Sequence, residues 1–598
     1  MKMKKITYIT SAATLVLFAL SGCNLDRAPL DTLAEQNYFN SREELETFTN
    51  GFYPLFPSAP AIFGETSDVV ITTDLTAEVL GTRSVPSNGG GWSWNALSNI
   101  NTYLTSSHKC TDEAARREND GVARFFRAYF YFEKVKRFGE VPWYSEPLSS
   151  TDDKLYDPRT PRETLMQNIL EDIDYAIENL PEKKDTYKLT KWTALALKSR
   201  IFLFEGTFRK YHELGDYQKY LQESAEAAKQ FIDRAPYSIS KRGNQPYRDL
   251  FSSDNAIDDE VILARNYNLS LSVVHSVNQY FMEGGVRPGL NKKIVNSYLT
   301  KDGKRFTDIE GYQELGFYAE MQNRDPRLAQ TIITPGYTRI KQNTPQSPSP
   351  YATCTGYQIT KWVTDAGQDS YNKSHNDMIL FRAAEVYLNY AEAKAELGTL
   401  TQEDLDATVL KIRERVGMPG INLAQANANP DPYLSSRETG YPNVSGPNKG
   451  VILEIRRERT IELICEGFRY YDLVRWKEGK ALEQQFKGVY FSAIDKEKGF
   501  TVYDMNGNGV YDRLDMCIYT TNKEPSKSEY PELKNVEVFL KLDDSVIQLE
   551  NGADGGNIIL HNINTTPRKW REDRDYLYPI PQSQITLYGG KLEQNPNW

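Results

Sequence analysis

Two stretches decide the fold: TKWTALALKSRIFLFEG at residues 190–206 and DYQKYLQESAEAAKQFI at residues 216–232. In both, apolar residues recur at the spacing of one helix face, which predicts two consecutive helices. The alanines Ala194, Ala196, Ala225 and Ala228 are small enough to let the two helices approach closely. Antiparallel helix pairs of this length are typical of tetratricopeptide-like units.

Further stretches on both sides repeat this pattern. Residues 121–138 (GVARFFRAYFYFEKVKRF) are apolar nearly all round, so we expect a buried helix that ends at Gly139. Other predicted helices cover residues 161–180, 378–397, 403–416 and 450–476. The helical period fades at about 240–375 and 485–560. The prediction is therefore a mainly α fold of degenerate tetratricopeptide-like helix pairs, with long irregular insertions and short strands.

The N-terminus has the features of a bacterial lipoprotein signal peptide. Lys2, Lys4 and Lys5 precede an apolar stretch over residues 6–20, which is too short and interrupted to span a bilayer. Leu-Ser-Gly then leads to Cys23, where we expect cleavage and lipidation. An ordinary secretory signal with a chance cysteine is the alternative. Residues 1–22 are thus predicted to be removed, leaving a lipid anchor on Cys23.

The charge balance of the chain excludes some partners. The full sequence carries 71 basic and 81 acidic side chains, and loss of the three N-terminal lysines changes the net charge from −10 to −13. Such an acidic chain is not expected to bind nucleic acid or to adsorb electrostatically to anionic lipid. The other cysteines, for which we expect buried or idle thiols, are Cys110, Cys354, Cys465 and Cys517.

The sequence contains no recognisable catalytic motif. Its five histidines form no HExxH, and GxSxG, P-loop and GxGxxG patterns are absent. Glutamates at four-residue spacing, interleaved with arginines, mark the predicted helix over 450–476; they are Glu454, Glu458, Glu462 and Glu466. A catalytic acid cluster is one interpretation, but a ladder of ion pairs that ties the helix into the bundle is favoured.

A calcium loop is the best local motif. The segment DMNGNGVYDRLD at residues 504–515 has a Gly at its sixth position, a backbone carbonyl at its seventh, and Asp at the twelfth where Glu is usual. The candidate ligands are Asp504, Asn506, Asn508, Val510, Asp512 and Asp515. The flanks have the pattern of strands, so this would not be a helix-loop-helix hand. A hairpin with two Asn-Gly turns is the alternative.

Aromatic residues in irregular segments are the candidates for ligand binding. Trp92 and Trp94 end a Gly-rich loop that also contains Arg83 and Asn88. An indole can stack on a sugar face while Arg and Asn bind hydroxyl groups. Core packing of these tryptophans is the alternative. Weaker candidates of the same kind are Tyr280, Arg287, Tyr357 and Trp362.

Several segments together resemble the SusD/RagB family of outer-membrane, glycan-binding lipoproteins. The resemblance runs in order from NLDRAPLDTLAEQNYF after Cys23, through ARFFRAYFYFEKVKRFGEVPWY, ILFRAAEVYLNYAEAKAELG and IRRERTIELICEGFRYYDLVRW, to YLYPIPQSQITLYGGKLEQNPNW at the end. It implies one SusD-like domain over residues 23–598, with an N-terminal part over about 23–235 and a C-terminal part over about 260–598. By position, it weakly supports Trp92, Trp94 and Arg83 as ligand-binding residues. Calcium, which some family members bind, would be a structural cofactor.

The resemblance also implies a function. Family members sit at the cell surface, lipid-anchored in the outer membrane, over a TonB-dependent, SusC-like transporter, and pass captured oligosaccharides into it without catalysis. Two alternatives remain: a scaffold or peptide-binding lipoprotein of the same transporter class, and, with less support, a surface glycoside hydrolase. A hydrolase would need two carboxylates at glycosidase separation in a cleft. A scaffold would show a large apolar groove and no sugar affinity.

Overall fold

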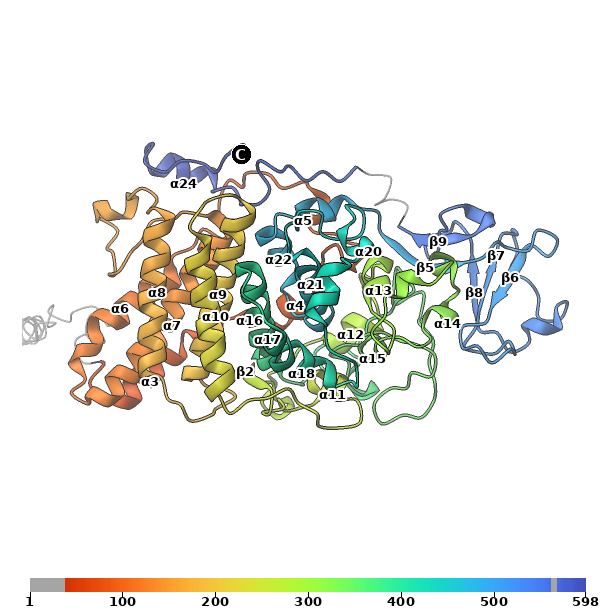
Figure 1. Cartoon of the computed structure of the whole chain (residues 1–598), viewed down its shortest axis with the longest axis horizontal. Helices are drawn as coiled ribbons and strands as arrows, with labels where there is room; N and C mark the ends of the chain where they lie inside the picture. Colours follow the sequence, from red (N-terminus) through yellow and green to blue (C-terminus); the bar gives the residue numbers. More distant parts are fainter. Residues whose placement is uncertain (1–37, 561–566) are drawn as a thin grey trace, which may run out of the picture.

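The computed structural model describes residues 38–560 and 567–598. An α-helical layer lies at one end of the long axis, shorter helices and irregular segments fill the centre, and a small β module lies at the other end (Figure 1). The mainly α prediction with short strands is confirmed. The predicted signal peptide and the lipidated Cys23 lie outside the described residues.

The first helical layer contains the predicted pairs. Its members are α3 (Arg42–Asn50), α6 (Asn95–Ser106), α7 (Glu113–Phe138), α8 (Arg162–Asn179), α9 (Lys191–Tyr211) and α10 (Tyr217–Arg234). Helix α7 packs against α8, and α9 packs against α10 (Figure 1). The predicted stop at Gly139 is confirmed: its φ of 73° lies in the left-handed half of backbone space, which a glycine adopts readily.

The α9–α10 contact shows why small residues were required there. A Cβ added at Gly206 would lie 2.7 Å from the Leu221 side chain, so only glycine fits. The Ser224 hydroxyl donates to the Ser199 carbonyl at 2.8 Å across the same contact. All four alanines of the predicted contact are buried. The two helices therefore pack almost backbone to backbone.

Two predicted helices of the C-terminal half are interrupted. Residues 378–397 form strand β4 (Met378–Arg382) and then helix α16 (Ala383–Leu397), so a single helix over this range is wrong. Residues 403–416 divide at Thr408 into α17 (Gln402–Ala407) and α18 (Val409–Glu414). Helix α16 packs against α10 on one side and α21 on the other, which joins the two halves of the chain.

The long helix predicted over 450–476 is also divided, into α21 (Lys449–Glu462) and α22 (Arg469–Arg475). Between them the φ angles of Cys465 and Gly467 are 59° and 80°, and a right-handed helix cannot continue through such residues. Helix α21 therefore ends before this connection, in which Gly467 is exposed.

The predicted ion-pair ladder is confirmed, but most of its partners come from other elements. Glu462 bonds Arg382 at 2.8 Å and also bonds Arg415, while Glu458 bonds Arg413 at 2.8 Å. All these side chains are buried. The ladder thus fastens α21 to β4 and α18, and removal of one partner would leave an uncompensated charge in the interior.

Short elements complete the fold. The short helices are α4 (Ala59–Phe63), α5 (Ala77–Leu80), α11 (Pro246–Ser252), α12 (Val277–Met282), α13 (Lys292–Ser297), α14 (Phe317–Glu320), α15 (Pro326–Ala329), α19 (Leu423–Ala428), α20 (Pro432–Ser435) and α24 (Gln582–Leu587). Antiparallel two-stranded pairs join β1 (Val70–Ile71) to β3 (Gly289–Leu290), β2 (Val261–Arg265) to β4, and β5 (Lys487–Phe491) to β9 (Gly556–Ile559). The loss of helical period predicted for about 240–375 and 485–560 is confirmed, because only short helices and short strands occur there.

The β module at the far end has its own small core. Strand β7 (Met516–Tyr519) pairs antiparallel with β6 (Phe500–Tyr503) and parallel with β8 (Val538–Lys541). Phe500, Val502 and Cys517 pack there with Leu533 and Val536. Each of the four cysteines in the described part of the chain is a buried free thiol, as expected.

Candidate functional site

The tryptophans predicted to stack on sugar lie in or against the core. Trp92 is 6% exposed, and its ring centroid lies 5.0 Å from Phe138 and 5.5 Å from Trp94. Trp94 is partly buried, 5.4 Å from Tyr144 and beneath the Lys134 ammonium. These contacts agree with the core-packing alternative for Trp92, and we therefore do not assign Trp92 a role in ligand binding.

Arg83 and Asn88, the two polar candidates of the same loop, differ in their surroundings. Arg83 is held by the C-terminal segment: its guanidinium lies 3.4 Å from the Asp575 carboxylate and over the rings of Tyr578 (4.5 Å) and Trp598 (5.4 Å). Its side chain is only 6% exposed, so a role in binding a ligand is not supported. Asn88 is exposed, and a binding role for it stays a prediction.

The weaker candidates are engaged elsewhere. Trp362 is 1% exposed and donates to the Cys465 carbonyl at 2.9 Å, so stacking on a ligand is wrong for this residue. Tyr357 is fully buried and donates to Glu320. Arg287 donates to the Val546 carbonyl at 2.8 Å, which ties it to the segment between β8 and β9. Tyr280 is half-buried near Phe63 and stays a prediction.

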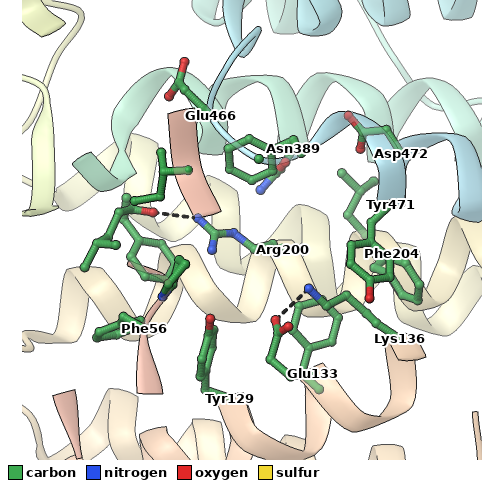
Figure 2. Close-up of a pocket in the computed structure, with 18 of the residues that line it drawn as sticks. Phe56, Tyr129, Glu133, Lys136, Arg200, Phe204, Asn389, Glu466, Tyr471 and Asp472 are labelled. Carbon is green, nitrogen blue, oxygen red and sulfur yellow. Dashed lines mark hydrogen bonds and ion pairs between the residues drawn. The ribbon is translucent and has the colours of Figure 1, made fainter. Parts of the chain in front are cut away.

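A different region has the geometry of a ligand site. A pocket of about 330 Å³ opens where α7 and α9 face β4 and the α21–α22 connection (Figure 2). We call it the aromatic pocket. Aromatic side chains on its walls are Phe56, Tyr129, Phe132, Phe204, Phe381, Phe468 and Tyr471. Polar or charged ones are Glu133, Lys136, Arg200, Asn389, Arg459, Glu466, Asp472 and Arg475. Aromatic walls with a few convergent polar groups are typical of small-molecule sites.

The cations of this pocket are paired. Lys136 lies 2.6 Å from Glu133, one helical turn away on α7. Arg200 donates to both carboxylate oxygens of Glu385, each at 2.6 Å, and to the Leu380 carbonyl at 3.0 Å. The remaining guanidiniums on the wall bond buried carboxylates as well: Arg459 to Asp472, and Arg475 to Asp472 and Glu392.

Several hydrogen-bonding groups face the pocket without a protein partner. Within the described residues, neither the Tyr129 nor the Tyr471 hydroxyl makes a hydrogen bond, and the Nη1 group of Arg200 donates to no protein atom. Burial raises the pKa of both tyrosines, so these hydroxyls stay protonated donors at neutral pH. The Glu133 carboxylate, 41% exposed, supplies an acceptor at the rim.

A weak sequence signal for this pocket lies on α7, outside the loops in which ligand-binding aromatic residues were sought. Glu133 and Lys136 are two of the charged positions in the largely buried helix over 121–138. A polar group on a buried helix faces either a partner or a cavity, and here it faces both. The other lining residues come from segments hundreds of positions apart, whose proximity only the fold reveals.

The predicted calcium loop joins β6 to β7 as a compact turn, with strands on both sides as expected. Asp504 accepts the backbone N–H groups of Gly507 (2.6 Å) and Gly509 (2.9 Å). Asp515, which is fully buried, accepts that of Met505 at 2.8 Å. Burial, with the negative charges of Asp512 and Asp504, raises the pKa of Asp515.

The remaining predicted ligands line the same loop. Asp512 accepts the side-chain amides of Asn506 (3.1 Å) and Asn508 (2.9 Å), and the Val510 side chain is 63% exposed. In the described part of the chain no three His, Cys, Asp or Glu side chains are grouped closely enough to hold a metal ion. Calcium at this loop stays a prediction, with amide and carbonyl oxygens required to complete the ligand set.

Comparisons with known proteins agree with the fold. Residues 250–598, more than half of the chain, match the family model described as "SusD family". Residues 93–203 match the model "Starch-binding associating with outer membrane". A SusD-like protein of Bacteroides ovatus is 23% identical over 557 residues, covering 85% of this chain and 90% of the relative.

Solved structures are similar over nearly the whole chain. A SusD-like carbohydrate-binding protein of Bacteroides fragilis matches with a TM-score of 0.64 and 19% identity, covering 92% of this chain and 98% of the other. A structure described with a xylogluco-oligosaccharide matches with a TM-score of 0.53 and 16% identity, covering 92% and 96%. No helix in residues 38–560 or 567–598 is long and apolar enough to cross a membrane. On the match over residues 250–598, this chain belongs to the SusD family.

Proposed function

We propose that this protein captures oligosaccharides outside the cell without catalysis and delivers them to a TonB-dependent transporter of the outer membrane. Membership of the SusD family supports the proposal, as does the carbohydrate-binding description of a structural neighbour. The lipoprotein pattern that ends at Cys23 supports an anchored, outward-facing protein.

The observation that carries the proposal is the aromatic pocket. It combines apolar ring surface with two unpartnered phenol hydroxyls and a free guanidinium nitrogen (Figure 2). Sugars present apolar C–H faces and rings of hydroxyl groups, so both kinds of contact are needed. The hydroxyls of Tyr129 and Tyr471 and the Nη1 of Arg200 would donate to sugar oxygens. The Glu133 carboxylate would accept from a sugar hydroxyl.

Calorimetry on the lipid-free chain tests this site. We expect a panel of neutral oligosaccharides to include at least one ligand, and the double variant Tyr129→Phe/Tyr471→Phe to bind it about tenfold or more weakly, because two hydrogen bonds are lost. Tyr217→Phe is the matched control, since Tyr217 lies on α10 outside the pocket. Undiminished affinity in the double variant would remove the pocket from the binding site. Release of reducing ends would contradict the non-catalytic role.

Delivery and anchoring need separate experiments. Cys23→Ala should shift the protein from the membrane fraction to the soluble fraction, because the acyl chains supply the membrane affinity. Co-purification of the lipidated chain with an outer-membrane transporter would test the partner. If the Cys23→Ala protein were still lipidated and still fractionated with the outer membrane, Cys23 would not be the anchor.

A further inference from the structure

We infer that the aromatic pocket selects neutral sugars and rejects glycans whose acidic groups would enter it, an inference that rests on the proposed function. The reason is that each cation on the wall already has a carboxylate partner. Lys136, paired with Glu133, and Arg200, paired with Glu385, are the two cations labelled in Figure 2. The pocket therefore offers hydrogen-bond donors without offering net positive charge.

The guanidinium charge of Arg200 is paired with the Glu385 carboxylate. Two parallel bonds to Glu385, whose side chain is 1% exposed, neutralise its charge, and its guanidinium lies 3.9 Å from the centroid of Phe381. Such a bidentate pair is fixed in geometry and does not open to admit another anion at low cost. The Nη1 donors that remain are aimed by this pair and can bond neutral hydroxyl oxygens.

The Lys136–Glu133 pair at the rim of the pocket also leaves no unpaired positive charge, although its carboxylate is more exposed to solvent than that of the Arg200–Glu385 pair. Lys136 is 13% exposed, lies over the ring of Tyr471 at 4.3 Å and bonds Glu133 at 2.6 Å. A sugar carboxylate that approached Lys136 would meet the negative charge of Glu133 beside it. Like charges placed side by side repel each other, and this disfavours binding of the acidic sugar.

Loss of hydration inside the pocket strengthens the preference for neutral over acidic sugars. An anion that enters the pocket loses part of its hydration, and an unpaired charge in such a place is costly. A neutral sugar loses only hydroxyl hydration, which the tyrosine and Arg200 donors replace. The acidic balance of the whole chain acts in the same direction at longer range, although salt screens that contribution.

The test compares uronate oligosaccharides of three to six residues with the same oligosaccharides after reduction of their carboxyl groups, by calorimetry on the lipid-free chain. We expect the carboxyl-reduced, neutral form to bind at least about tenfold more tightly than the uronate form. The variant Glu133→Gln frees Lys136, and we expect it to narrow that ratio by about tenfold, because the ammonium can now pair with the sugar carboxylate. Glu226→Gln is the matched control, since Glu226 is exposed on α10, away from the pocket.

The outcomes separate the two proposals. Equal or tighter binding of the uronate form by the unsubstituted chain would overturn neutral selectivity while leaving sugar capture intact. Binding of neither form, nor of any neutral oligosaccharide in the panel, would overturn the proposed function and this inference with it. If Glu133→Gln melted normally and left the ratio of neutral to uronate affinity unchanged, the Lys136–Glu133 pair would not be the cause of neutral selectivity.

Discussion

Replacement of Glu65 by Gln should stabilise the protein above neutral pH. Glu65 follows helix α4 and is 8% exposed. Its Oε2 atom accepts the Gly467 N–H at 3.4 Å, and its Oε1 atom has no hydrogen-bond partner. Burial raises the pKa of this carboxyl from 4.5 to about 7, so the folded protein holds a proton that the unfolded chain releases.

The sign and size of the effect follow from that difference. Between pH 4.5 and about 7 the folded state binds more protons at Glu65 than the unfolded state, so the free energy of unfolding falls as pH rises through this window. At about 1.4 kcal/mol for each unit of pKa, the loss reaches roughly 3 kcal/mol above pH 7. Relaxation around the site reduces this, and we expect a gain of about 1–3 kcal/mol for Glu65→Gln at pH 8. Gln keeps an oxygen for the Gly467 N–H and carries no titrating proton.

Melting temperature measured from pH 5 to pH 8 checks this expectation. The variant should match the unsubstituted chain at pH 5 and melt progressively higher than it toward pH 8. Glu478, whose pKa burial also raises to about 7, is present in both chains and cancels in the difference. Glu226→Gln, an exposed substitution, should leave the profile unchanged. Parallel profiles for Glu65→Gln and the unsubstituted chain would refute the reasoning.

Three further perturbations have expected outcomes. Arg382→Met leaves the buried Glu462 carboxylate undercompensated and should destabilise the fold by about 3–5 kcal/mol in urea denaturation; a loss under about 1 kcal/mol would contradict the ladder's role. Gly206→Ala forces a Cβ to 2.7 Å from Leu221 and should cost about 1–3 kcal/mol, with a neutral result arguing against the close α9–α10 contact. Added calcium should raise the melting temperature relative to chelator, and Asp515→Asn should abolish the shift; no shift in the unsubstituted chain would count against the calcium site.

Helical periodicity was sufficient to predict the frame of this fold. The stretches that became α7 and the α9–α10 pair carry long, regular apolar patterns with clear stop signals, and the structure confirms them. Periodicity was insufficient at residues 378–382, where MILFR is a short continuous apolar run that suits a strand or a buried helix equally. The division of α21 from α22 depends on positive φ angles at Cys465 and Gly467. Gly467 is a stop signal that the helix predicted over 450–476 ran through, whereas Cys465 has no sequence signal for that conformation.

The candidate site was less predictable because aromatic residues serve two purposes. Trp92 and Trp362 stand in Gly- and Thr-rich segments typical of recognition loops, yet both fill the core. The residues of the aromatic pocket lie on segments that each have a structural reason to be apolar. Only their convergence in space separates Tyr129 and Tyr471 from the many tyrosines that merely pack.

The contacts between Arg83 and the C-terminal segment have a consequence for the order of folding. This side chain from the start of the described chain is enclosed by Tyr578 and Trp598, and the Asn595 amide donates to the Phe138 carbonyl at 3.0 Å. These contacts can form only after the last residues have been synthesised, although domains generally fold from the N-terminus as the chain emerges. A chain that still lacks its last residues therefore leaves Arg83 and the Phe138 carbonyl without these contacts, and the packing around them is completed only when the C-terminal segment is present.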